Sequence, residues 1–149
     1  MDIKRRVKNL EKKYGTRNPY KLCEFLNIEV IYMDLGNLKG IFKKVITNNF
    51  IVINENLDEF CQKVVLAHEL GHAILHNSKD IQTLKDYDLF PKYSNRLEVE
   101  ANTFAAELLI DDDFDNDEYI ENPSIDIRIL EQLKELKYKE LILKKVKLW

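Results

Sequence analysis

Two histidines, His68 and His72, stand on either side of a glutamate, Glu69, in the pattern HExxH. On a helix, residues four apart lie on one face about one turn from each other, so both imidazoles can bind a single ion. Glu69 points in a neighbouring direction, where it can reach a water at an open position of that ion and act as a base. These residue types at this spacing predict a catalytic metal centre, and the chemistry they favour is hydrolysis of a peptide bond.

The residues around this motif predict a buried helix. Apolar side chains fill positions 64–67 and 73–75 almost all round, which is the pattern of a helix without a solvated face. We expect this helix to run from about 57 to 76. A carboxylate and two imidazoles are costly to bury there unless they are paired or bind a metal. Core histidines satisfied by hydrogen bonds are the alternative interpretation, and the motif favours the metal.

A third ligand has to come from another position, because two histidines leave a zinc ion short of ligands. The remaining histidine, His76, would lie about 12 Å along the helix axis from His68. We therefore expect His76 to line the site or to cap the helix end. A second amphipathic helix, expected from about 95 to 110, offers two carboxylates, Glu98 and Glu100.

The two glutamates differ in the residues that share their side of the helix, that is, the stripe of positions three and four residues apart. Glu98 shares its stripe with small or polar residues, namely Ala101, Asn102 and Ala105. Small residues let two helices approach closely enough for a glutamate to reach across to a metal. Glu100 shares its stripe with Arg96, Thr103 and Glu107, which predicts a solvated face. We predict Glu98 as the third ligand, with Glu100 as the alternative, and we expect Asn102 to hydrogen-bond a ligating histidine.

Three short strands are expected before the motif helix. Alternating apolar residues predict a strand at 28–33. Two more, at 40–46 and 50–53, are expected to form a hairpin with a turn at 47–49. We expect the three strands to pair antiparallel. Further helices are expected at 3–14, from Pro19 onward, and in the C-terminal tail.

Length and composition predict one soluble domain. The 149 residues carry a formal charge of −3, with 45% hydrophobic and 33% charged residues, which gives no electrostatic case for nucleic acid. No run reaches the length of a membrane span, and the first residues lack the apolar core of a signal peptide. Cys23 and Cys61 lie far apart in helical patterns. We therefore expect reduced thiols and a cytoplasmic protein that binds neither membrane nor DNA directly.

One metallopeptidase domain is expected over residues 1–149, with helices and sheet at 1–56, catalytic helices at 57–110 and a helical segment at 119–149. The polar connection 77–94 is either a flap beside the site or a mobile surface loop. The acidic run 111–118 is interpreted as a solvated loop, since no EF-hand glycine or terminal glutamate falls in register.

Two blocks of the sequence, 67–76 and 98–109, resemble the ImmA/IrrE family of metallopeptidases. The resemblance also takes in 50–54 and covers about 18 to 110. It implies an α+β fold, with the small antiparallel sheet packed against a helical, zincin-like core. It also implies that His68, His72 and Glu98 bind the metal and that Glu69 is the catalytic base. The family usually continues its two leucines with Met-Pro, whereas this chain has Ile110-Asp111.

The resemblance also implies a function. The family's members act on helix-turn-helix repressors, so the expected activity is site-specific cleavage of such a repressor, relieving repression of a phage, mobile element or stress regulon. Zinc is the expected metal, and manganese or iron also suit nitrogen and oxygen ligands. Tyr87, Tyr93 and His76 are candidate donors to the oxyanion. The alternative is a non-catalytic metal-containing regulator that sequesters a repressor or antitoxin. Intact Glu69 argues against that alternative, because a structural site needs no base.

Overall fold

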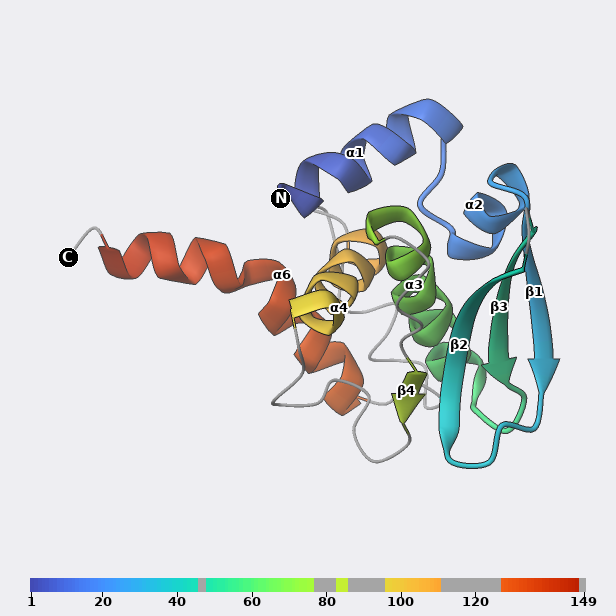
Figure 1. Ribbon diagram of the computed structural model, residues 1–149. Helices are drawn as coiled ribbons and strands as arrows, with labels where there is room; N and C mark the ends of the chain where they lie inside the picture. The colour runs from blue at the N-terminus through green and yellow to red at the C-terminus, as the bar shows by residue number, and fades with distance from the viewer. Residues whose placement is uncertain (46–47, 77–82, 86–95, 111–126, 148–149) are drawn as a thin grey trace.

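A computed structural model describes residues 1–45, 48–76, 83–85, 96–110 and 127–147. These residues form α1 (Ile3–Tyr14), α2 (Pro19–Phe25), β1 (Ile28–Met33), β2 (Leu38–Val45), β3 (Asn48–Asn54), α3 (Glu59–Leu75), β4 (Thr83–Lys85), α4 (Arg96–Leu109) and α6 (Ile127–Lys147). The predicted α+β class is confirmed. Figure 1 shows the sheet on one side of α3, with α4 on the other side and α6 beyond it.

Local capping explains where the helices begin and end. The side chain of Asp2 accepts a hydrogen bond from the backbone N–H of Arg5, and Gly15 ends α1 in the left-handed region at φ 73°. Asp58 caps α3 in the same way, accepting from the N–H of Cys61 at 2.8 Å. The motif helix therefore starts two residues later than predicted, at Glu59, because Asp58 supplies the cap.

The sheet is mixed, so the prediction of an antiparallel three-stranded sheet is wrong. Its strand order is β1-β3-β2-β4, with β1 parallel to β3 and the other pairs antiparallel. Strand β3 lies between β1 and β2, and its Ile51 and Ile53 are fully buried. The β1–β2 connection must then cross two strand spacings, roughly 10 Å, to leave room for β3. The fourth strand, β4, comes from the 77–94 connection that was expected to be irregular.

A buried asparagine at the end of β3 stabilises this crossing. Asn54 donates from Nδ2 to the carbonyls of Gly36 and Leu38, at 3.2 and 2.9 Å. Its side chain therefore satisfies backbone groups of the connection between β1 and β2. Asn48 and Asn49, which were expected in the turn at 47–49, belong to β3 and pair with β2.

Helix α3 lies between two apolar clusters, which explains its apolar residues all round. One cluster joins it to α1, α2, the sheet and α4, and includes Leu66, Leu70 and Phe104. The other joins its opposite side to α4 and α6. A buried ion pair, Lys137 Nζ to Glu107 Oε2 at 3.0 Å, adds a second link between α6 and α4. Among the helices in the described ranges, none has the length and apolar character needed to cross a membrane.

Candidate metal centre

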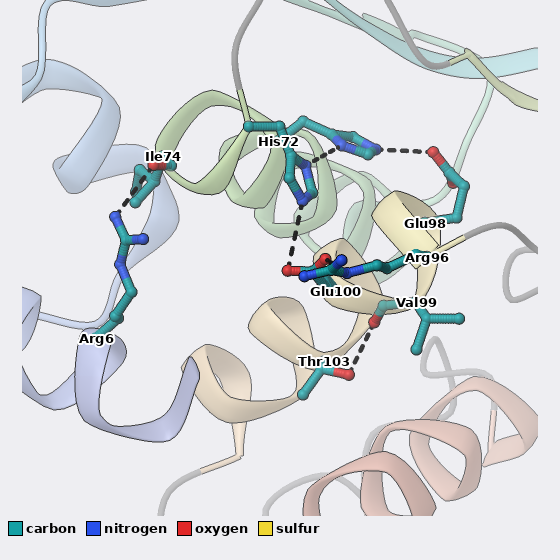
Figure 2. A network of polar contacts seen from close by, with 9 residues as sticks. Arg6, His72, Ile74, Arg96, Glu98, Val99, Glu100 and Thr103 are labelled. Atoms are coloured by element: carbon teal, nitrogen blue, oxygen red, sulfur yellow. Dashed lines mark hydrogen bonds and ion pairs between the residues drawn. The ribbon is translucent and has the colours of Figure 1, made fainter. Parts of the chain in front are cut away.

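The two motif histidines of α3 and Glu98 of α4 converge on one point. Their candidate ligand atoms all lie within 4.8 Å of one another. His68 Nε2 is 3.2 Å from Glu98 Oε2, and His72 Nε2 is 2.9 Å from Glu98 Oε1. Figure 2 shows the His72–Glu98 contact between the two helices. The structure thus brings together the three residues that the sequence singled out as ligands.

This cluster fits a divalent ion better than it fits mutual hydrogen bonding. His68 and His72 are 0% and 4% exposed, yet neither Nε2 has a hydrogen bond of acceptable geometry. Buried polar atoms rarely go without a partner. Two imidazole nitrogens and a carboxylate are the donor set of a catalytic zinc site, which leaves a fourth position open. The interpretation as satisfied core histidines does not account for these nitrogens.

The other ring nitrogen of each histidine has a partner. His68 Nδ1 lies 2.6 Å from Asn102 Oδ1, which is the contact predicted for Asn102. His72 Nδ1 lies 2.9 Å from His76 Nδ1. His76 is also the residue that ends α3, and its backbone N–H donates to the carbonyl of His72 at 3.0 Å. Both expectations for His76, lining the site and capping the helix end, are confirmed.

The prediction that Glu100 lies on a solvated face is wrong. Its side chain is 13% exposed, and Oε2 lies 3.9 Å from His76 Nε2. The end of α3 covers this part of α4, which the stripe pattern of α4 alone could not show. Glu100 is absent from the cluster of ligand atoms and stands behind His76 instead.

A glycine within the motif permits the close approach of α3 and α4. A Cβ on Gly71 would lie 3.1 Å from Phe104 Cβ and 3.2 Å from Ala101 Cα. Those distances are tighter than ordinary van der Waals contact, so a larger side chain would separate the helices. The glycine thus helps Glu98, one turn before Ala101, to reach the two histidines.

Glu69 is completely buried beside this cluster. Burial raises the pKa of Glu69 to about 8. His72 and the backbone of Phe42 partly offset this rise, whereas the charge of Glu98 adds to it. The backbone of Phe42 is close enough to lower the pKa of Glu69. Neither carboxylate oxygen of Glu69, however, has a hydrogen bond of good geometry. A base needs a pKa near the working pH, and this environment supplies one.

Glu69 should make the metal-free protein less stable as the pH rises from about 4.5 to about 8. In that window the folded state keeps the proton that the unfolded chain loses, so the free energy of unfolding falls with pH. Glu69→Gln should remove this slope and stabilise the metal-free protein at the alkaline end. Urea denaturation of both proteins in EDTA, at several pH values across the window, measures the difference. Parallel profiles for the two proteins would contradict the prediction.

The environments of Glu98 and His76 lower the pKa values of both side chains. Burial alone would raise the pKa of Glu98, but its contacts with His68 and His72 outweigh burial and bring the pKa to about 2. Burial, together with neighbouring His72, lowers the pKa of His76 below its usual value, although Glu100 opposes the shift. Glu98 is therefore ionised at neutral pH, as a metal ligand must be.

A glycine of β2 permits the close approach of the sheet to Val65 of α3. A Cβ on Gly40 would lie 2.5 Å from Val65 Cγ1 and 3.4 Å from Glu69 Cγ. A glycine inside a strand pattern is a signal of close backbone approach, so the sequence carries a sign of this role that was not among the predictions.

Gly40→Ala should lower the free energy of unfolding by about 1 to 3 kcal/mol, because Val65 is stiff and cannot move aside freely. Urea denaturation measures the change. A double-mutant cycle with Val65→Ala should show the two changes offsetting each other, since the clashing methyl is then absent. Additive effects would mean that the contact is not the cause.

Several predicted features lie outside the described residues. These are the candidate oxyanion donors Tyr87 and Tyr93, the acidic run 111–118, and most of the 77–94 connection. Of the three candidate oxyanion donors, His76 lies within the described residues, and its ring contacts that of His72.

Comparison with known proteins identifies the family. Residues 23–133 match the Peptidase M78 family model, described as an IrrE N-terminal-like domain. The chain is 45% identical over 111 residues to Uncharacterized immunity region protein 2 of Bacillus phage phi105, covering 74% of this chain and 69% of that protein. It is 38% identical over 112 residues to Metallopeptidase ImmA of Bacillus subtilis (strain 168), covering 74% of this chain and 64% of that relative. The chain belongs to the Peptidase M78 family, the ImmA/IrrE family that its two sequence blocks resemble.

Proposed function

We propose that this protein is a metal-dependent endopeptidase, with His68, His72 and Glu98 as metal ligands and Glu69 as general base. The observation that carries the proposal is the pairing of a three-ligand cluster with a fully buried glutamate. A structural metal site would close its fourth position and would not need that carboxylate. Burying Glu69 beside the cluster is costly, and a role as base explains why it is there.

The chain's own residues supply proton transfer and orientation. A divalent ion held by the two histidines and Glu98 would supply Lewis acidity toward a water and the scissile carbonyl. Glu69, with its pKa raised to about 8, takes a proton from the attacking water and can return it to the leaving amine. Asn102 and His76 keep the rings of His68 and His72 in position from their Nδ1 sides.

We propose zinc as the metal. The nitrogen and oxygen donors also suit manganese and iron, so each has to be tested. Metal analysis of the purified protein, followed by reconstitution of the EDTA-treated protein with each ion, identifies the one that restores activity.

The proposed substrate is a helix-turn-helix repressor encoded near the protein's own gene. Two similarities support it: one relative is named as a phage immunity region protein and the other as Metallopeptidase ImmA. Cleavage of such a repressor would relieve repression of a phage, a mobile element or a stress regulon. We place the reaction in the cytoplasm, where the thiols of Cys23 and Cys61, which form no disulfide, would stay reduced.

The test combines the purified protein with the neighbouring helix-turn-helix regulator and one metal at a time. Gel electrophoresis and mass spectrometry of the products should show cleavage at one bond, lost in EDTA. Binding of the regulator without cleavage, with every metal supplied, would instead favour a regulator that sequesters its partner.

A further inference from the structure

An open pocket lies where the connection between α1 and α2 meets the first half of α3 and the end of α4. Its volume is about 190 Å³, and the described residues that line it are Arg17, Asn18, Lys63, Leu108 and Leu109. Leu108 comes ten residues after Glu98 on α4, which places the pocket roughly 15 Å along that helix from the metal cluster. The proposed peptidase mechanism gives this pocket no role.

Arg17 is held in place at this pocket from two sides. Its Nε is paired with Glu11 Oε2, and its Nη1 donates to the carbonyl of Glu107 at 3.0 Å. The side chain is 18% exposed, so the guanidinium has little freedom left to lose when a ligand binds. The described residues supply no acceptor for Nη2, whose two N–H groups remain for a ligand.

Asn18 and Lys63 add further donors to the same lining. Asn18 Oδ1 accepts from the backbone N–H of Tyr20 at 2.9 Å, so the polar atom that Asn18 still offers is the donor Nδ2. Neither Asn18 Nδ2 nor the ammonium of half-buried Lys63 has a partner in the part of the chain that the structure describes. Among the described lining residues, none is acidic. The pocket therefore favours an anion that can accept several charge-assisted hydrogen bonds.

The size of the pocket and its two leucines define the ligand further. Leu108 and Leu109 provide an apolar wall, which suits a carboxylate on an apolar stem. The volume exceeds the ~30 Å³ that one water takes up in the liquid and is below the roughly 300–1,000 Å³ of pockets that enclose whole small-molecule ligands. A group the size of one side chain binds weakly alone, whereas as part of a docked protein it adds to the surrounding contacts.

We propose that this pocket docks an acidic side chain of the protein substrate, away from the bond that is cut. Arg17 and Lys63 pair with the carboxylate, and the two leucines pack on its stem. This inference rests on the proposed function, which supplies the protein substrate.

A small carboxylate tests the chemistry of the pocket without any substrate. Isovalerate should shift the methyl NMR signals of Leu108 and Leu109, and its uncharged amide, isovaleramide, should not. Lys63→Met keeps the apolar stem but removes the charge, so it should lose the response. Lys21→Met is the matched control, because Lys21 is an exposed lysine of α2 outside the pocket lining. No response to isovalerate, or equal responses to acid and amide, would overturn the proposal.

Binding of the neighbouring helix-turn-helix regulator tests the docking role. The measurement uses Glu69→Gln as the background, so that the regulator stays intact. Adding Lys63→Met should weaken binding about 10-fold or more, the loss expected for a hydrogen bond to a charged group. Lys63→Arg keeps the charge and should retain most of the affinity. In the active protein, Lys63→Met should raise KM and leave kcat unchanged, because the pocket is remote from the reacting atoms.

The outcomes separate this proposal from the proposed function. Equal affinity of Lys63→Met and Lys21→Met for the regulator would refute the docking role even if the regulator is cut. Binding that depends on Lys63, without cleavage by the active protein, would overturn the proposed function and leave the docking role standing. Thermal denaturation of each variant shows whether its fold is intact.

The chain's own acidic run, 111–118, is the competing occupant, because it begins two residues after Leu109. Asp111→Asn, Asp112→Asn and Asp113→Asn, combined in one protein, remove three of its charges. The isovalerate response should be the same in this protein as in the wild type. A response that appears only in this triple variant would assign the pocket to the chain itself and refute the proposal.

Discussion

Replacing Glu69 by glutamine should reduce the rate at which the proposed repressor substrate is cleaved about 10²- to 10⁴-fold, the range expected for loss of a general base. Glutamine keeps the shape of the side chain but cannot take a proton from water. Glu98 cannot substitute for Glu69, because both of its oxygens face the ligand nitrogens of His68 and His72. Metal binding should be preserved, because Glu69 is outside the ligand cluster.

Single-turnover cleavage, with metal content measured on the same samples, separates the two effects. Glu59→Gln is a matched control, since Glu59 is an exposed glutamate in the first turn of the same helix, α3. The control should cleave at the wild-type rate. Full activity in Glu69→Gln would show that Glu69 is not the base. Loss of the metal from Glu69→Gln would contradict the prediction that Glu69 is not needed for metal binding.

The motif helix and its partner could be predicted because their signals are local. The spacing of His68 and His72 fixes both imidazoles on one face of any helix that contains them. The small residues after Glu98 indicated the close contact between helices, and Ala101 does lie against Gly71. Each of these inferences needs only the periodicity of one segment.

The order of the strands could not be predicted in the same way. Pairing between β1 and β3 joins segments that are separated by the whole of β2, and no local pattern records it. The contacts of Asn54 with Gly36 and Leu38 favour this crossing, but they are visible only once the chain has folded.

Glu100 shows the limit of stripe arguments within the site itself. Its stripe neighbours on α4 are polar, yet the end of α3 and His76 cover it. A helical pattern predicts which residues share a face, while the elements that pack on that face decide whether it meets solvent.

Glu98→Gln should weaken zinc binding more than any change at Glu100 does. A neutral amide replaces the anionic member of the proposed ligand set, so we expect a loss beyond the roughly 10- to 100-fold that is typical of residues behind the ligands. Chelator competition on Glu98→Gln and Glu100→Gln side by side measures the contrast. A larger loss in Glu100→Gln would transfer the ligand role to Glu100, which was the alternative on sequence grounds.

The same substitution should destabilise the metal-free protein, the reverse of the effect expected at Glu69. The pKa of Glu98 is lowered to about 2 in the folded protein, so its contribution to stability is present above its ordinary pKa and is lost as the pH falls toward 2. At neutral pH, Glu98→Gln gives up the contacts with both histidines, whereas Glu69→Gln relieves a buried carboxyl. Urea denaturation in EDTA at neutral pH should therefore place the two variants on opposite sides of the wild type. If both variants shift the midpoint in the same direction, the two carboxylates do not occupy the contrasting environments that a ligand and a base require.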